Sequence, residues 1–488
     1  MREWPPLAHS TPAAEPSFDA SSLAAALGGK LLNEGRAPIR GGAVDSRRVE
    51  PGNAFFALPG ERTDGHNFVV DACRRGAAAV VVSRAIDADV LGRLRNAGSP
   101  TVVRVGEVLA GLHAAAAAWR ARFDPLVVGV TGSLAKTSTK EQISEVLSER
   151  WTVLRNTANE NNEIGLPLTL LRLRPTDDVA VLEMGMYEPG DIALLADLAQ
   201  PRVGVVTAVR TTHLARAGSI VAIERGKREL IDALPVGGSA VLNADDERVA
   251  RMADRRAGQL RVLRYGFAAD ADVSAGAIES LAEDGMTFTL RAGGDTIDAR
   301  IPALGRHSVH NALAAAAVGI ALGLDLRTIA TGLARPFSVP HRSTLLTAGD
   351  WRLLDDTYNA APDSMAAALD LLASLPGRRV AVLGEMLELG PESDSAHRRI
   401  GAHTARTADL LVAVGPMAAL YGAGARDAGL GPDAIIETPD RAAALAALEH
   451  RLRPGDVVLL KASRGAKLDL LVDELVRLAQ TDQAEAVR

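Results

Sequence analysis

The chain has 488 residues, and at about 150 residues a domain this length predicts roughly three domains. Apolar residues make up 47% and aromatic residues only 3%, so the domain cores must rest on alanine, leucine and valine. The 54 basic and 60 acidic residues leave a net charge of −6 without a long basic tract, which gives no reason to expect nucleic acid as a partner.

The first 17 residues are predicted to form a flexible tail, because four of them are proline and no apolar core of a secretory signal is present. No uninterrupted apolar run is long enough to span a bilayer, so we expect no membrane insertion. The isolated Cys73 cannot form an intramolecular disulfide and fits a reducing compartment as a small buried side chain. The expected location is the cytoplasm, and a monomer is the simplest expectation.

Residues 18–124 are predicted to form a small α/β domain. A helical stretch at 21–27 ends at Gly28 and Gly29, and the apolar run 77–82 indicates a buried strand. An alanine-rich helix at about 109–122 closes this block.

Residues 125–335 are predicted to form a doubly wound parallel sheet. Buried strands are expected at 126–130, 179–182 and 204–207, with helices between them and a further helix at about 308–322. Alternation of strand and helix is typical of parallel α/β sheets.

Residues 336–488 are predicted to form a second, Rossmann-like α/β domain, and Pro336 and Pro340 mark a plausible hinge before it. Its expected strands are 351–354, 380–383, 410–414 and 457–460.

The run GVTGSLAKT at 129–137, here called the phosphate loop, joins the first strand of the central block to a helix. Small residues let backbone N–H groups approach phosphate oxygens, and the helix N-terminus adds a positive dipole end. Gly132, Ser133 and Ser138 would then contact the phosphates of ATP, Lys136 would supply a cation, and the Thr137 hydroxyl can ligate Mg²⁺. The alternative is a glycine-rich turn that carries an accidental lysine.

Polar residues follow the other strands, where ligands gather in open α/β sheets. Glu183 suits a Mg²⁺ ligand or a solvated loop carboxylate, and His213 suits a metal ligand or a structural histidine. Spacing alone makes Lys227 a solvated lysine on a helix. Asp355 and Asp356 fit a role in binding ribose or a metal ion, or in capping a turn. Lys461 and Arg464 fit either the binding of an anionic substrate group or a solvated loop.

Eight short runs, taken in order and spacing, resemble the Mur ligase family of peptidoglycan synthesis. They are DSR at 45–47, DGH at 64–66, NENNEIG at 159–165, LEMG at 182–185, NADD at 243–246, GRH at 305–307, DDTYNAAPDSM at 355–365 and LGEMLELG at 383–390. The last two favour the members that add D-alanyl-D-alanine to UDP-N-acetylmuramoyl-tripeptide. A DNPR run, typical of the diaminopimelate-adding members, is absent.

The resemblance implies a three-domain architecture in which each domain has its own task. The first domain binds the UDP-sugar, the second binds ATP and the third completes the ligation, which proceeds through an acyl-phosphate intermediate. It implies two Mg²⁺ ions, the first held by Thr137 and Glu183 and the second by His213 and a carbamoylated Lys227. The remaining roles that it implies are adenine contact by Asn311, ribose contact by Asp356, nucleotide contact by Arg342, UDP-sugar contact by Ser46 and Arg47, substrate contact by Asn159, Asn161, Asn162 and Asn359, and contact with the dipeptide carboxylate by Lys461 and Arg464.

The chain departs from the family pattern at several positions around the nucleotide and metal. These departures are Ala135 for glycine, Val209-Arg210 for Asn-Ile, Ala215 for glutamate, Ser308 for asparagine and His341 for glycine. They fit a tuned site, a divergent lineage or reduced activity. Two other functions stay open at this point: a catalytically weak homologue that serves as a binding scaffold, and an amide ligase of the same superfamily that acts on a folate or an amino-acid polymer.

Overall fold

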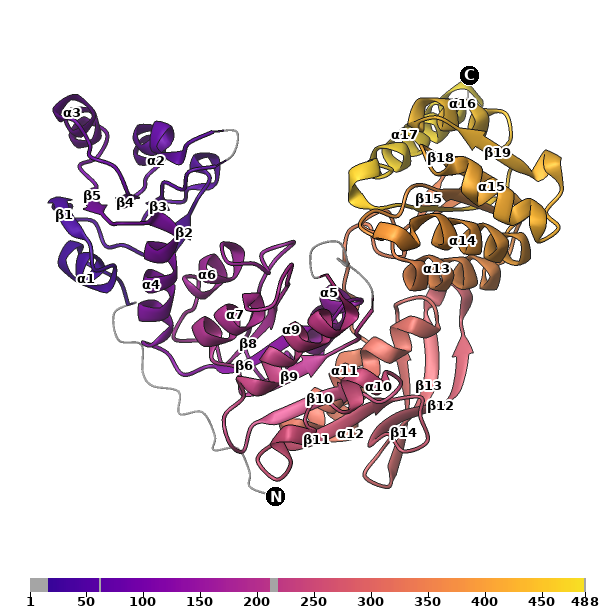
Figure 1. Cartoon of the computed structure of the whole chain (residues 1–488), viewed down its shortest axis with the longest axis horizontal. Coiled ribbons are helices and arrows are strands. Elements are labelled where there is room, and N and C mark those ends of the chain that lie inside the picture. Colours follow the sequence, from indigo (N-terminus) through magenta and orange to yellow (C-terminus); the bar gives the residue numbers. More distant parts are fainter. Residues whose placement is uncertain (1–15, 61–62, 211–217, 487–488) are drawn as a thin grey trace.

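The computed structural model describes residues 16–60, 63–210 and 218–486, which form three α/β domains in a row (Figure 1). The N-terminal and C-terminal domains lie at opposite ends, with the central domain between them. Most of the tail predicted at 1–17 lies outside the described residues, although the carbonyl of Ser17 accepts a hydrogen bond from Arg122. Within the described ranges, no helix is long and apolar enough to cross a bilayer.

The N-terminal domain is built on a five-stranded sheet in the order β1-β5-β4-β3-β2, in which only the β1–β5 pair is antiparallel. Its elements are α1 (Ala20–Ala26), β1 (Lys30–Asn33), β2 (Gly42–Ala43), η1 (Ser46–Arg48), β3 (Ala54–Phe56), η2 (Gly65–Phe68), α2 (Val69–Arg74), β4 (Ala79–Val82), α3 (Ala88–Asn96), β5 (Thr101–Arg104) and α4 (Val108–Arg120). Cys73 is buried and unpaired, as predicted, and burial raises the pKa of its thiol to about 12.

The central domain is built on a nine-stranded sheet in the order β14-β13-β12-β11-β10-β9-β6-β8-β7. Its elements are β6 (Leu126–Thr131), α5 (Lys136–Leu147), β7 (Val153–Arg155), α6 (Gly165–Leu170), β8 (Val179–Glu183), α7 (Asp191–Ala199), β9 (Val203–Val206), α9 (Ile220–Asp232), β10 (Ser239–Asn243), α10 (Glu247–Ala250), β11 (Arg261–Gly266), β12 (Val273–Ser280), β13 (Met286–Ala292), β14 (Asp295–Ile301), α11 (Arg306–Ala321) and α12 (Leu326–Leu333). Strands β6 to β12 pair in parallel, which confirms the predicted parallel sheet, whereas β13 and β14 extend it in antiparallel fashion.

The C-terminal domain is built on a six-stranded sheet in the order β15-β16-β20-β17-β18-β19, parallel except for β15 at one edge. Its elements are β15 (Thr344–Ala348), β16 (Trp351–Asp355), α13 (Pro362–Ser374), β17 (Arg379–Leu383), α14 (Ser393–Thr407), β18 (Leu410–Val414), α15 (Ala418–Asp427), β19 (Ile435–Thr438), α16 (Arg441–Glu449), β20 (Val457–Lys461) and α17 (Asp469–Ala486). All four strands predicted for this block are confirmed, each extended by at most one residue.

Small side chains explain how a chain with few aromatic residues fills the central core. The run 312–317 of α11 is fully buried, and five of its six residues are alanine, so the helix packs closely on the sheet and on α5. Gly332 of α12 shows the same close approach, because a Cβ there would lie 2.5 Å from the Cα of Val146 in α5. These contacts hold α5, and with it the loop that precedes it, in a fixed position.

Candidate active site

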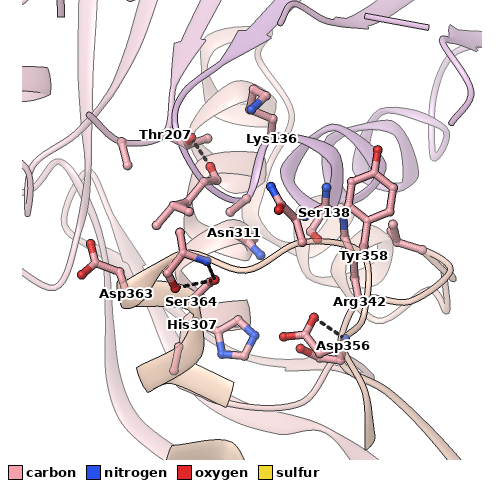
Figure 2. A pocket seen from close by; sticks show the side chains of 18 of the residues that line it. Lys136, Ser138, Thr207, His307, Asn311, Arg342, Asp356, Tyr358, Asp363 and Ser364 are labelled. Atoms are coloured by element: carbon pink, nitrogen blue, oxygen red, sulfur yellow. Dashed lines mark hydrogen bonds between the residues drawn. The ribbon is translucent and has the colours of Figure 1, made fainter. Parts of the chain in front are cut away.

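A cleft of about 1370 Å³ is lined by residues of both the central and the C-terminal domain. The ends of β6, β8 and β9 and the first turns of α11 line it from the central side, and residues after β16 and β20 line it from the other. Figure 2 shows side chains that face this cleft from both domains, among them Lys136, Ser138, His307 and Asn311 from one and Arg342, Asp356 and Tyr358 from the other.

The phosphate loop wraps around the N-terminus of α5, which begins at Lys136. Gly132 has a φ of +149°, and a Cβ there would lie 1.9 Å from the hydroxyl oxygen of Thr207, so only glycine fits. The Thr207 hydroxyl in turn donates to the carbonyl of Leu134 at 2.5 Å, and Nζ of Lys136 donates to the carbonyl of Gly132 at 2.9 Å. Burial lowers the pKa of Lys136, while the nearby Glu183 carboxylate opposes that shift.

Ala135 adopts the left-handed backbone conformation that its glycine-like position suggests, with φ of +61° and ψ of +6°. A Cβ in that conformation costs roughly 1–2 kcal/mol, which exceeds the chain entropy that glycine would lose. We therefore expect Ala135→Gly to raise the free energy of unfolding by about 0.5–1 kcal/mol. Thermal unfolding followed by circular dichroism measures this change.

The matched control for Ala135→Gly is Ala117→Gly in α4, an exposed position inside a regular helix. There glycine should lower the stability by about 1 kcal/mol, because no strain is relieved. Equal destabilisation by both substitutions would show that the left-handed backbone at Ala135 stores no strain.

Glu183 ends β8 beneath the phosphate loop and is buried, which rules out the solvated loop carboxylate. Its carboxylate accepts hydrogen bonds from the Thr137 hydroxyl at 2.8 Å and from the amide of Asn161 at 2.7 Å. Asn156 fixes the backbone of Glu183 by pairing with both its N–H and its carbonyl. Hydroxyl and carboxylate oxygens are the ligands that Mg²⁺ prefers, so the Thr137–Glu183 pair fits such an ion.

Lys227 is buried in α9, so the solvated lysine expected from its spacing is wrong. Its side chain is drawn inward because α9 packs on the sheet through Ile223, Leu230 and Ile231. Burial, and secondarily the charge of Lys136, lower the pKa of Lys227 well below its usual value. Among the residues that the structure describes, its amine forms no hydrogen bond or ion pair. His213, predicted beside it, lies outside the described residues.

Asn311 lies on α11, where it lines the cleft and accepts a hydrogen bond from the Thr139 hydroxyl at 3.3 Å. Next to it His310 contacts the Asp245 carboxylate at 3.0 Å and meets the ring of Phe267 edge-on at a centroid distance of 5.5 Å. Asp245 and Phe267 also line the cleft. No local sequence pattern predicts this cluster of His310, Asp245 and Phe267, because its members come from separate elements.

The C-terminal side of the cleft is dominated by a stack of three side chains. The guanidinium of Arg342 lies 4.2 Å from the ring centroid of Tyr358, and that of Arg464 lies 5.4 Å from it. Arg342 also donates to the Thr137 hydroxyl at 3.4 Å, and its Nε is buried without a hydrogen-bond partner. Because one guanidinium touches both the phosphate loop and this stack, the two domains share one site.

Lys461 is buried and not part of a solvated loop. Its ammonium donates to the Asp356 carboxylate at 2.6 Å and to the carbonyl of Asn359 at 2.9 Å. Asp355, in contrast, caps its own turn by accepting from the N–H and hydroxyl of Thr357.

The structure brings most of the predicted site residues into the same cleft. Those that line it are Ser133, Lys136, Ser138, Asn159, Asn161, Asn162, Glu183, Asn311, Arg342, Asp356, Asn359, Lys461 and Arg464. Gly132, Thr137 and Lys227 are buried and are not part of this lining. Ser46 and Arg47 lie in η1 of the N-terminal domain, where Arg47 is 80% exposed and pairs with Asp45.

Comparison with known proteins gives this architecture a family. Three family models match the chain: the Mur ligase family catalytic domain at 38–118, the Mur ligase middle domain at 130–319 and the Mur ligase glutamate ligase domain at 341–464. The UDP-N-acetylmuramoyl-tripeptide–D-alanyl-D-alanine ligase of Mycobacterium tuberculosis is 38% identical over 468 residues, which cover 88% of this chain and 91% of the relative. The chain belongs to the Mur ligase family.

Other Mur ligases match this chain over most of its length. The enzyme of the same name from Escherichia coli is 38% identical over 376 residues, covering 76% of the chain and 80% of that protein. A crystal structure of MurF from Acinetobacter baumannii superposes with a TM-score of 0.84 at 29% identity, covering 95% of the chain and all of that structure. MurF from Thermotoga maritima in complex with ADP gives a TM-score of 0.78 at 28% identity and coverages of 91% and 98%. The predicted three-domain architecture is confirmed.

Proposed function

We propose that this Mur ligase uses ATP to join D-alanyl-D-alanine to UDP-N-acetylmuramoyl-tripeptide. The observation that carries the proposal is the contact of Arg342 with Thr137, because it places the phosphate loop and the C-terminal domain around one cleft. Relatives that are 38% identical over most of their length bear the name of that activity. In this proposal residues 18–124 bind the UDP-sugar, 125–335 bind ATP and 336–488 complete the ligation.

The first chemical step would be phosphoryl transfer. An oxygen of the tripeptide carboxylate attacks the γ-phosphorus of ATP, the bond to the β–γ bridging oxygen breaks, and ADP leaves an acyl phosphate behind. Negative charge spreads over the transferred phosphoryl oxygens. Lys136, the N–H groups of the phosphate loop and the Arg342 guanidinium are positioned around the same end of the cleft to stabilise that charge.

The second step would form the new amide. The amine of the dipeptide attacks the acyl carbon, the C–N bond forms, the bond to the phosphate oxygen breaks, and the amine gives up a proton. The dipeptide also carries a carboxylate. Since Lys461 already pairs with Asp356, we assign that carboxylate to Arg464, which lines the cleft beside Tyr358.

Two Mg²⁺ ions, when bound, would neutralise phosphate charge beside Lys136. Thr137 and Glu183 would hold the first, as their oxygen pair suggests. For the second we propose His213 and a carbamoylated Lys227. Burial lowers the pKa of Lys227 and so favours its neutral amine, which is the form that takes up CO₂, and carbamoylation would turn it into an anion suited to a metal.

We propose that the reaction takes place in the cytoplasm and that the protein is a monomer. The test is phosphate release by the purified chain with ATP, Mg²⁺, UDP-N-acetylmuramoyl-tripeptide and D-alanyl-D-alanine. We expect release that depends on both peptide substrates and a product heavier by the dipeptide less one water in mass spectrometry. No release above the control without dipeptide would refute the proposed function.

A further inference from the structure

Arg210 links the two domains that form the cleft. It follows β9 in the central domain, and its guanidinium lies between two carboxylates. Nη1 donates to Asp246 at 2.5 Å, and Nε donates to Asp363 at 2.7 Å. Asp246 belongs to the central domain and Asp363 to the first turn of α13 in the C-terminal domain, where it faces the cleft (Figure 2). One side chain therefore spans the domain boundary.

The central end of this link is rigid. The side chain of Asp246 is only 3% exposed. Besides the bond from Arg210, it accepts hydrogen bonds from the backbone N–H groups of Val209, Arg248 and Val249. A buried carboxylate with this many partners has a fixed orientation, so the guanidinium that pairs with it is fixed as well.

The backbone of Arg210 is tied to the phosphate loop. The Ser133 hydroxyl donates to the carbonyl of Arg210 at 3.1 Å and accepts from its N–H at 2.9 Å. The N–H of Ser133 donates to the carbonyl of Ala208 at 2.8 Å. A shift of the phosphate loop at Ser133 would therefore move the backbone of Arg210.

Helix α13 is held on the central domain at its other end as well. Arg352 of β16 pairs with Glu283 of the central domain and donates to the carbonyl of Pro376, which follows α13. Between the two ends, Leu304 of the central domain is buried in the same apolar cluster as Leu371 of α13. The Arg210–Asp363 pair therefore anchors the end of α13 that lies nearest the phosphate loop.

We propose that Arg210 is a positioning residue for the ligation, one that sets the C-terminal domain over the phosphate loop through Asp363. This inference rests on the proposed function, and it deepens it by naming a group that acts through another residue. Through this link Arg210 would hold Tyr358 and Arg464, which are carried by the C-terminal domain, over the cleft.

The test replaces Asp363 with asparagine, because this leaves the buried Arg210–Asp246 pair intact. We expect KM for D-alanyl-D-alanine to rise about fivefold, the effect of an ion pair worth about 1 kcal/mol. The dissociation constant of ADP, measured by calorimetry without the other substrates, should stay within about twofold. The matched control is Asp427→Asn, another arginine-paired carboxylate of the C-terminal domain, which should change neither value.

Coupling is tested with Arg210→Lys, since one ammonium cannot reach both carboxylates as the guanidinium does. In the Asp363→Asn background, Arg210→Lys should add little to the rise in KM. Independent, multiplying effects of the two substitutions, or an unchanged KM in Asp363→Asn, would overturn the proposal. Small-angle scattering supplies a readout that needs no turnover: the radius of gyration should rise in Asp363→Asn, and an unchanged value would overturn the link even if the wild-type chain shows no ligase activity.

Discussion

Lys136→Met is expected to lower kcat by about three orders of magnitude, which corresponds to about 4 kcal/mol of transition-state stabilisation. Lys136 is the first residue of α5, and its ammonium is held against the carbonyl of Gly132 at the mouth of the phosphate loop. Methionine keeps an unbranched, flexible side chain, one atom shorter than that of lysine, but removes the cation that would face the transferred phosphoryl group. Initial rates of phosphate release, measured at saturating substrates, give the change in kcat.

The control for this substitution is Lys30→Met, which removes an exposed lysine of β1 and should leave kcat unchanged. The fold of the Lys136 variant is checked by circular dichroism, because a collapsed central domain would also lose activity. A folded Lys136→Met variant that kept more than a tenth of the wild-type kcat would remove Lys136 from the proposed chemistry.

Several parallel strands could be predicted because they are buried along their whole length. Strands β6, β8 and β18 read as continuous apolar runs, and such runs are typical of sheets covered by helices on both sides. Other strands of the central sheet escaped prediction, among them the parallel β7, β10 and β11. Strands β12 and β14 also escaped it, because they carry exposed polar residues, such as Glu279 and Asp295, and lack a continuous apolar run. Both pair antiparallel with β13, which a linear pattern does not reveal.

The site shows the same division between local and long-range information. The phosphate loop is one continuous run, so Lys136 and Thr137 could be assigned from local chemistry. The placement of Arg342 and Arg464 beside Tyr358 depends on how β16 and β20 pair, and no local pattern encodes it. The Arg210–Asp363 contact joins residues 153 positions apart, in two domains. The sequence of Arg210 and its neighbours shows a departure from the family pattern but does not predict the contact with Asp363.

Lys227→Met is expected to abolish turnover while leaving the protein at least as stable as the wild type. The amine of Lys227 is buried in α9 and has no partner among the described residues, so its desolvation is not offset by a hydrogen bond. Methionine fills similar space without a polar group, which should stabilise the fold by about 1–3 kcal/mol. Thermal unfolding and phosphate release, measured on the same preparation, test the two halves of this expectation.

The matched control is Arg225→Met, which removes an exposed cation from the same helix and should affect neither activity nor stability.

Lys227→Ala separates a carbamate from a merely structural amine, because it opens space in which a small carboxylate can replace the missing anion. We expect acetate or propionate to restore part of the activity of Lys227→Ala and none of Lys227→Met, where the space is filled. A fully active Lys227→Ala variant would exclude the carbamate. An inactive variant that no carboxylate rescues, together with a Lys227→Met variant less stable than the wild type, would instead assign Lys227 to the core: the buried amine would then contribute to stability and not to catalysis.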